Sequence, residues 1–311
     1  MLISEVIMET RVLQNFLRVA QAGKLGHAAA ELNIAQPALS RQIALLEADV
    51  GAQLFVRHRR GVTLTEAGLL FRDHARAILA ALEQARSEVS ATAQDPSGTV
   101  ALGLPTSMFY VLSADAVAAY RALYPNVFLR VHEAVGHVIE ALCHDGQLDA
   151  AILIEPGAMP GVALTPLVAE DICLVGPREA GLSLDEPVSL DDLAAAPIIM
   201  LDAANHVRRR IENLLGQHGL SLNPAMEMEG QPLTFEMVRR GHGHTVLPRS
   251  AAQQELNAGR MSAAPIAGAT LAWSLAVSRT RADAPEVRAL TELLHEIAQG
   301  RIDDGTWQQA Q

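Results

Sequence analysis

The sequence predicts an α/β protein in three parts: a helical N-terminal segment with a short β-hairpin, one long helix, and a C-terminal part of alternating strands and helices. Three observations lead to this prediction. Apolar residues recur at spacings of three and four from Met8 to Val50. No proline interrupts residues 66–95, and from Val100 onward short apolar runs alternate with amphipathic stretches. With 311 residues, half of them hydrophobic, the chain can form two or three domains with sizeable cores.

Three helices are predicted in the N-terminal segment. The first begins near Met8 and ends at Gly23, and the second covers about 26–33. The third begins at Gln36-Pro37, because proline suits the first helical position, and ends at Gly51. Two short helices with a tight turn are typical of a helix-turn-helix, whose second helix reads base edges in the major groove. The residues of this helix that we expect to contact DNA are Gln36, Pro37, Ser40, Arg41 and Gln42.

A basic β-hairpin is predicted directly after these helices. Residues 54–56 and 62–64 have the composition of two short strands, and Arg57 to Gly61 would form the tip between them. A solvated turn is the alternative interpretation. Because the hairpin follows a recognition helix, we favour a wing whose arginines hold DNA phosphates: Arg57, Arg59 and Arg60.

The distribution of charge agrees with this assignment, although the net charge of −11 does not suggest DNA binding. Residues 1–66 contain seven Lys and Arg and six Asp and Glu, a balance of +1, whereas the rest of the chain carries −12. Phosphates respond to charges within a Debye length of about 8 Å, so the local cluster matters more than the total.

Several motifs of this segment resemble those of the LysR-type transcriptional regulators. They are Ala28-Ala29, Gln36-Pro37-Ala38-Leu39-Ser40-Arg41-Gln42-Ile43, Leu46-Glu47, Gly51, Gln53-Leu54-Phe55 and Leu64-Thr65-Glu66-Ala67-Gly68. The resemblance implies a winged helix-turn-helix, a dimerisation helix and a two-lobed effector-binding domain like a periplasmic binding protein. We therefore expect a transcription regulator that is no enzyme and has no cofactor. Its expected partners are double-stranded DNA, a small-molecule effector and itself, as a homodimer or homotetramer, with RNA polymerase as a further candidate.

The sequence departs from the family pattern at two helix starts. The family usually has Ser or Thr at the opening of the second helix and before the Gln-Pro pair, where this chain has Lys24-Leu25-Gly26-His27 and Ala35. The loss of such an N-cap costs about 1 kcal/mol. In the C-terminal part, residues 124–127, 146–152 and 246–248 resemble the family's effector domain. Gly136-His137 and residues 245–250 are similar to its nitrogen-assimilation-control branch.

A long helix is predicted from Glu66 to Gln94, about 43 Å at 1.5 Å per residue. Its apolar residues alternate spacings of four and three, which is a heptad pattern. The helix could pack on its own chain, but the resemblance favours an antiparallel dimer held by Phe71, Ile78, Leu82 and Val89. We expect a DNA-binding domain at 1–65, this linker at 66–96 and an effector domain at 97–311, with lobe I at about 97–168 and 270–301 and lobe II at about 169–269.

The alternation of strands and helices after residue 97 predicts a parallel sheet with right-handed crossovers. The expected strands are 100–104, 127–131, 150–154, 171–175, 198–201, 245–247 and 271–277, and the expected helices are 107–120, 138–144, 207–217 and 285–299. Strand ends of such a domain line a ligand crevice. We expect a small polar or anionic effector there, although Thr106 could simply cap a helix. The candidate contacts are Thr106, Ser107, Ile154, Leu201, Asp202, His244 and Thr245.

Other classes of function find less support in the sequence. It has no nucleotide-binding glycine loop, nucleophile elbow or HExxH motif. His242 and His244 lack further ligands for a metal, and Cys143 and Cys173 have no basic neighbours to activate a thiol. A redox-sensing or effector-independent regulator is the alternative, and a metabolite-binding protein or enzyme with an added DNA-binding domain is a weaker one. With no membrane span and no signal-peptide core, the cytoplasm is the expected compartment.

Overall fold

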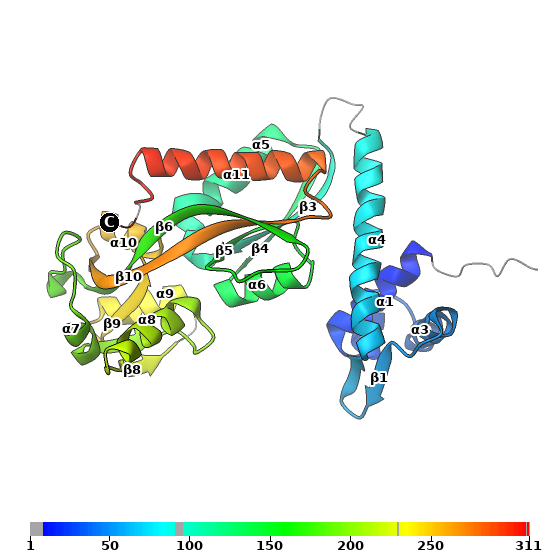
Figure 1. The fold of residues 1–311 in the computed structure, drawn as a ribbon, viewed down its shortest axis with the longest axis horizontal. Coiled ribbons are helices and arrows are strands. Elements are labelled where there is room, and N and C mark those ends of the chain that lie inside the picture. The colour runs from blue at the N-terminus through cyan, green and yellow to red at the C-terminus, as the bar shows by residue number, and fades with distance from the viewer. Residues whose placement is uncertain (1–8, 91–95, 229, 309, 311) are drawn as a thin grey trace, which may run out of the picture. The chain divides into compact units, whose positions relative to one another are not determined.

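A computed structural model describes residues 9–90, 96–228, 230–308 and 310; the side chains of residues 80 and 83–90 lie outside this description. The chain forms two compact units, residues 1–89 and 90–311 (Figure 1). Each unit is described by itself.

The N-terminal unit contains three helices, a hairpin and a long helix: α1 (Thr10–Ala22), α2 (Leu25–Glu31), α3 (Gln36–Val50), β1 (Phe55–His58), β2 (Gly61–Leu64) and α4 (Glu66–Ser90). Phe16, Leu39, Ile43 and Leu46 form its core with residues from every helix. Hairpin and helices meet where the Val62 amide donates to the Gly23 carbonyl at 2.8 Å. Gly61 must be glycine there, because an added Cβ would collide with that carbonyl oxygen.

The hairpin is tighter than the sequence indicated. Its antiparallel strands pair from Phe55 with Leu64 to His58 with Gly61. The turn therefore consists of Arg59 and Arg60 alone, and Arg57 belongs to strand β1 instead of the tip.

Some apolar residues of helix α4 are buried in the core of the N-terminal unit, and others are exposed. Phe71 packs edge-on against Phe16 with ring centroids 5.0 Å apart, and Ala75 is fully buried in the same core. This start of the predicted seam therefore packs on its own chain, which was the alternative interpretation. In contrast, 47% of Ile78 is exposed, and Leu82 is half-buried. The side chain of Val89 and the predicted helical residues 91–94 lie outside the described residues.

The C-terminal unit is built on one eight-stranded sheet, in the order β4-β3-β5-β10-β6-β9-β7-β8. Its strands are β3 (Gly98–Pro105), β4 (Val127–Ala134), β5 (Ala150–Ile154), β6 (Val162–Pro177), β7 (Pro197–Met200), β8 (Asn223–Glu227), β9 (His244–Pro248) and β10 (Met261–Ser278). The expected parallel sheet is correct only in part. Strand β3 pairs in parallel with β4 and β5, and β7 with β8 and β9, but β10 runs antiparallel to β5 and β6, and β6 runs antiparallel to β9.

The long strands β6 and β10 run through both halves of the sheet and create two lobes. Lobe I holds β3, β4, β5 and the helices α5 (Ala114–Leu123), α6 (Gly136–His144) and α11 (Pro285–Asp303). Lobe II holds β7, β8, β9 and the helices α7 (Leu190–Ala195), α8 (His206–Gln217), α9 (Gln231–Arg239) and α10 (Arg249–Asn257). The pairing of β6 with β10 shifts register between residues 265 and 270, near the change from one lobe to the other.

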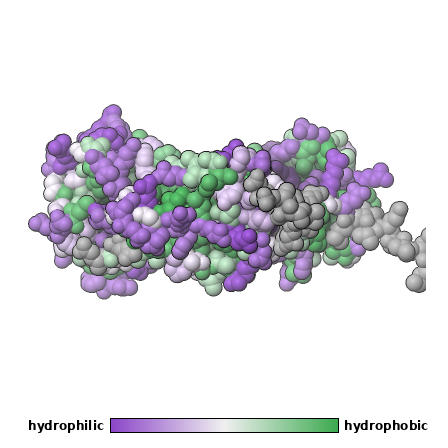
Figure 2. Space-filling view, turned by 90° about the horizontal axis from the view of Figure 1, so that it is seen from above, coloured by the Kyte–Doolittle hydropathy of each residue, from purple (hydrophilic) through white to green (hydrophobic). Residues whose placement is uncertain are grey.

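The first helix of lobe I is irregular at its start. A 3-10 turn at Thr106–Met108 and a π-helical turn at Phe109–Ser113 lead from β3 into α5. Single π-helical turns often occur near functional sites. Seen from above, hydrophilic residues cover much of the visible surface, with an apolar area among them (Figure 2).

The end of the chain packs on the strand that links the lobes. Trp307 is buried with its ring centroid 6.4 Å from that of Trp273 on β10, and the Ala310 amide donates to the Ala169 carbonyl of β6 at 2.8 Å. Beside these rings the buried Glu170 carboxylate accepts hydrogen bonds from the Ser250 amide and hydroxyl and from the Trp273 indole.

Candidate DNA-binding surface and effector cavity

The start of α3 presents polar groups to solvent. Gln36, Pro37 and Arg41 are exposed, and Ser40 is half-buried. Neither Lys24 nor Ala35, which precede α2 and α3, caps its helix with a side chain. The structure thus agrees with the sequence that both family N-caps are missing, and the first amides of these helices are left for another acceptor.

Two hydrogen bonds tie the predicted contact residues to the rest of the unit. The Arg57 guanidinium donates to the Ser40 hydroxyl at 3.2 Å, which joins the hairpin to the recognition helix. The Asn15 amide on α1 donates to the Gln42 side-chain carbonyl at 2.7 Å. Gln42 is therefore held in place and keeps its own NH₂ group as a donor. Asn15 was not predicted as a functional residue, although a polar residue on the apolar face of α1 could have indicated it.

Glu47 fixes the hairpin relative to α3. Its side chain is buried, and one carboxylate oxygen accepts the Leu54 amide at 2.8 Å and the Phe55 amide at 3.0 Å. Glu47 appeared in the sequence analysis merely as part of a family motif. Its place between Leu46 and Ala48, on the inner side of a helix, could have indicated a buried carboxylate with a structural role.

The hairpin and the start of α3 carry positive charge that is not paired with a carboxylate. Arg57, Arg59 and Arg60 are exposed, and among the described residues no carboxylate pairs with them or with Arg41. Unpaired guanidinium groups lose no ion pair when they bind phosphate, so this surface can hold an anionic backbone.

A cavity with a volume of about 480 Å³ lies between the two lobes of the C-terminal unit. Thr106 and Ser107, directly after β3, Ile154 at the end of β5, and Leu201 after β7 line it, as the sequence predicted. Other lining residues were not predicted, and three of them, Phe235, Arg239 and Glu255, lie on helices α9 and α10, which the sequence did not indicate. The lining residues that were not predicted include Phe109, Tyr110, Glu133, Gly136, Asn205, Phe235, Arg239, Leu247 and Glu255.

Three residues expected in the effector site do not line this cavity. The Asp202 carboxylate accepts the Ala204 amide at 2.6 Å and so closes the turn before α8. The His244 ring lies against Gly176, where an added Cβ would be 2.6 Å from it, and Thr245 is fully buried. Both residues begin β9, whereas its carboxyl end, Leu247-Pro248, faces the cavity.

The charged groups at the lobe II wall form a closed network. The Glu255 carboxylate accepts from Arg260 at 2.8 and 2.9 Å and from Arg239 at 3.1 Å, and Arg239 also pairs with Glu236. These hydrogen bonds, led by that from Arg260, lower the pKa of Glu255 below its usual value. The two carboxylates of Glu236 and Glu255 are thus shared by three arginines, namely Arg239, Arg240 and Arg260.

An ion pair joins the lobes beside the cavity. His206 at the start of α8 lies 2.8 Å from Glu140 of α6. Burial lowers the pKa of His206, while Glu140 opposes this shift. This contact links α8 of lobe II to α6 of lobe I.

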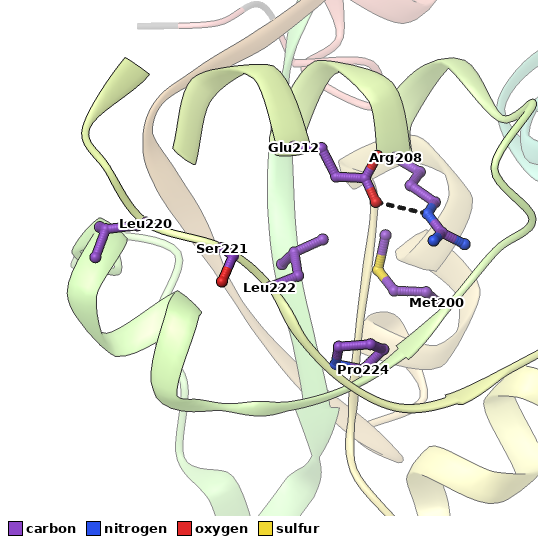
Figure 3. A pocket seen from close by; sticks show the side chains of 7 residues that line it. All are labelled: Met200, Arg208, Glu212, Leu220, Ser221, Leu222 and Pro224. Carbon is purple, nitrogen blue, oxygen red and sulfur yellow. Dashed lines mark hydrogen bonds and ion pairs between the residues drawn. The ribbon is translucent and has the colours of Figure 1, made fainter. Parts of the chain in front are cut away.

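A second, smaller pocket of about 240 Å³ lies beside α8 and β8 (Figure 3). The Arg208 guanidinium at its wall donates to Glu212 at 2.8 Å, Glu227 at 2.6 Å and the Leu201 carbonyl at 2.8 Å. Its polar groups serve to join α8 to the sheet edge.

Both thiols and the histidine pair lack the features of reactive or metal sites. Cys143 and Cys173 are buried, and burial raises their pKa values to about 11 and 12. Such thiols stay protonated at neutral pH, which disfavours the redox alternative. Within the described ranges, no three His, Cys, Asp or Glu side chains gather as a metal site, and no helix is long and apolar enough to cross a membrane.

Comparison with known families assigns both units. Residues 10–69 match the model of a bacterial regulatory helix-turn-helix protein of the lysR family, and residues 93–299 match the LysR substrate binding domain. The chain belongs to the LysR family. It is a DNA-binding transcription regulator with a substrate-binding domain. The helix-turn-helix model and the named relatives are regulators, in agreement with the expectation that the protein is no enzyme.

Individual LysR proteins are similar along nearly the whole chain. The nitrogen assimilation regulatory protein nac of Klebsiella aerogenes is 34% identical over 291 residues, 92% of this chain and 94% of its own. That of Escherichia coli (strain K12) is 32% identical, with 97% and 99% covered. The similarity to the nitrogen-assimilation branch that Gly136-His137 indicated is thereby confirmed.

Solved structures of full-length LysR regulators share the fold. An OxyR variant from Pseudomonas aeruginosa has a TM-score of 0.69 at 22% identity, with 95% of each chain covered. Full-length BenM has a TM-score of 0.55 at 26% identity and covers 97% of this chain and 99% of its own. A LysR regulator, CbnR, was solved with its target DNA (TM-score 0.53, 22% identity, 94% and 100% covered).

Proposed function

We propose that this LysR regulator changes its DNA binding when a small molecule occupies the cavity between the lobes. The observation that carries the proposal is the position of the cavity, since Thr106 and Ile154 contribute from lobe I and Leu201 and Phe235 from lobe II. A ligand that contacts both lobes favours one angle between them. It shifts the equilibrium between the two lobe arrangements by the difference in its binding free energy for them.

DNA is contacted in this proposal by the exposed start of α3 and by the hairpin. Gln36, Ser40, Arg41 and Gln42 would face base edges with Pro37 beside them, and Arg57, Arg59 and Arg60 would hold phosphates. The Arg57–Ser40 bond supports this arrangement because it aligns the two elements on one surface.

Dimerisation is proposed to use the outward side of α4 in its second half. Ile78 is nearly half exposed although it is apolar, and Leu82 follows it by four residues on the same side. A second copy would bury both and would place two recognition helices on an inverted repeat. RNA polymerase and the cytoplasm remain our proposals for a further partner and for the place of action.

The test replaces Thr106 by Val, which keeps the volume and removes a cavity hydroxyl, and replaces Thr165 by Val as a matched control. Thr165 is exposed on β6 and does not line the cavity. DNase footprints on the promoter beside the protein's own gene are recorded with and without metabolite pools. We expect Thr106→Val to bind DNA normally and lose the metabolite response, whereas Thr165→Val keeps it. A normal response in Thr106→Val would contradict a ligand at this loop.

A further inference from the structure

We infer that Asn15 on α1 is a positioning residue for base recognition. It holds the Gln42 side chain so that the NH₂ group of Gln42 is presented to the DNA, and the protein thereby selects guanine over cytosine at one position of its operator. This inference rests on the proposed function, because Gln42 is one of the base contacts proposed there. It gives a buried residue a part in reading the DNA sequence.

Asn15 is a polar residue in an apolar environment. Only 3% of it is exposed, and the other well-buried residues of α1 are apolar: Val12, Leu13, Phe16 and Val19. A buried amide loses its hydrogen bonds to water, and this is unfavourable unless partners inside the protein replace them. The partner of Asn15 is on the recognition helix, where its Nδ2 donates to Gln42 Oε1 at 2.7 Å.

This hydrogen bond determines which end of the Gln42 amide is held by the protein. The NH₂ group of Asn15 can only donate, so it attracts the carbonyl of Gln42 and disfavours the NH₂ group of Gln42 in the same place. A hydrogen bond between neutral groups favours one such orientation several-fold. Gln42 is half-buried and directly follows the exposed Arg41 on α3. Its NH₂ group is therefore the end that remains for the DNA.

A glutamine that presents its NH₂ group distinguishes guanine from cytosine. In the major groove guanine offers two acceptors, N7 and O6, whereas cytosine offers only the N4 donor. A glutamine with both ends free can instead pair with adenine through its carbonyl and NH₂ group together. Because Asn15 occupies the carbonyl of Gln42, guanine is the base that suits the remaining donor, and cytosine would bring two donors together.

A purely structural role of Asn15 has different consequences. The bond between α1 and α3 would then contribute to the stability of the whole unit, and its loss would weaken recognition at every base pair alike. A positioning role predicts a change at the one base pair that Gln42 reads.

The experiment first locates this base pair. Each base pair in one arm of the operator, taken from the footprint on the promoter beside the protein's own gene, is replaced in turn. The affinity of the full-length protein for each DNA is measured by fluorescence anisotropy. The base pair whose preference disappears in Gln42→Ala is the one that Gln42 reads. At this position we expect the wild-type protein to bind guanine about tenfold more tightly than cytosine.

Two variants then test the orientation of the Gln42 amide. Asn15→Leu keeps the branched shape of the side chain and removes the donor, so the preference for guanine should fall to about twofold or less while those at the other base pairs remain. Gln42→Glu keeps an acceptor for Asn15 but presents only acceptors to the DNA, so the preference should change to cytosine. The control Gln14→Leu removes an exposed amide from the same helix and should keep the wild-type preference.

Several results would overturn the inference. A wild-type preference for cytosine at this base pair would mean that both amides have the opposite orientation. A guanine preference that persists in Asn15→Leu or in Gln42→Glu would show that Asn15 does not determine it. An Asn15→Leu protein that loses its preferences at all base pairs together would have lost a structural bond only.

The same measurements separate this inference from the proposed function. If Gln42→Ala changes no base-pair preference, the proposed contact of Gln42 with DNA is wrong, and the inference is wrong with it. If Gln42→Ala removes a preference that Asn15→Leu retains, the contact is supported and only the role of Asn15 is wrong.

Discussion

The carboxylate of Glu47 is predicted to hold the DNA-binding unit together. Glu47→Ala leaves the buried amides of Leu54 and Phe55 without their acceptor. A hydrogen bond to a charged group contributes about 1.5–3 kcal/mol, so the loss of both should cost about 3–6 kcal/mol of unfolding free energy. Glu47→Gln keeps one carbonyl oxygen for the two amides and should cost about 1 kcal/mol. The first loss is a large share of the roughly 5–15 kcal/mol that stabilise a typical domain.

The two tryptophans allow the two units to be followed separately. Both of them, Trp273 and Trp307, lie in the C-terminal unit, so their fluorescence in urea reports that unit alone. Hydrogen exchange of the Leu54 and Phe55 amides reports the N-terminal unit. In Glu47→Ala we expect these amides to exchange faster by two or more orders of magnitude, with an unchanged tryptophan transition, and DNA affinity to fall because the wing loses its position.

The Glu47 reasoning would be refuted if Glu47→Ala matched Glu47→Gln within about 0.5 kcal/mol. Water or another acceptor would then accept hydrogen bonds from the two amides, and the carboxylate would have no special role. A loss of the tryptophan transition would show instead that the substitution acts through both units.

Three further predictions follow from the structure. Arg41→Ala should lower the free energy of operator binding by about 1–3 kcal/mol and relax the sequence preference of the protein. Arg59→Ala should weaken binding to operator and unrelated DNA alike and flatten the salt dependence of binding in a fluorescence anisotropy titration. If Arg41→Ala also weakened operator and unrelated DNA equally, this division of roles would be contradicted. Leu82→Glu should abolish dimers in analytical ultracentrifugation and with them the footprint, and persistent dimers would place the seam elsewhere. Burial raises the pKa of Glu170 to about 7, so the folded state favours its protonated form and stability should fall as the pH rises from about 4.5 to 7, by a few kcal/mol at most. Glu170→Gln should remove that slope in melts followed by tryptophan fluorescence, and a wild-type curve without it would refute the assignment.

Local sequence signals predicted the helix-turn-helix because single residues determine its boundaries. Pro37 restricts the backbone at the start of α3, and Gly51 allows the left-handed conformation that ends it, so the structure begins and ends the helix where they indicate. The hairpin was placed correctly, but the length of its turn was overestimated. Arg57 and His58 extend β1 because their backbones pair with β2 whatever their charge.

Long-range pairing explains what the sequence did not predict in the C-terminal unit. Strands β6 and β10 contain Pro166, Asp171 and Gly268, which weaken the local strand signal, and their mutual pairing tolerates these residues at irregular positions. Local patterns carry no direction for a strand, so the antiparallel members of the sheet were missed.

The cavity was predicted where the rule for strand ends was applied consistently. Thr106, Ile154 and Leu201 follow the carboxyl ends of β3, β5 and β7, and all three line it. His244 and Thr245 stand at the amino end of β9, for which the same rule predicts a position away from the ligand. The helices that complete lobe II were missed because nothing local marks the start of α9 except Gly230 and Pro232.

The buried Trp307 sets a practical limit on how the ligand-binding part can be cut out for screening. The family match ends at residue 299, but this indole, eight residues further on, fills the space beside Trp273. A fragment ended at the family boundary would lack a large core side chain, and the loss of a buried tryptophan typically costs about 3–5 kcal/mol. Its absence would also expose the buried Glu170 carboxylate near the linking strands and so loosen the lobe geometry that a screen is meant to detect. Fragments for crystallisation or ligand screening should therefore retain the chain through Ala310, with any purification tag joined by a spacer.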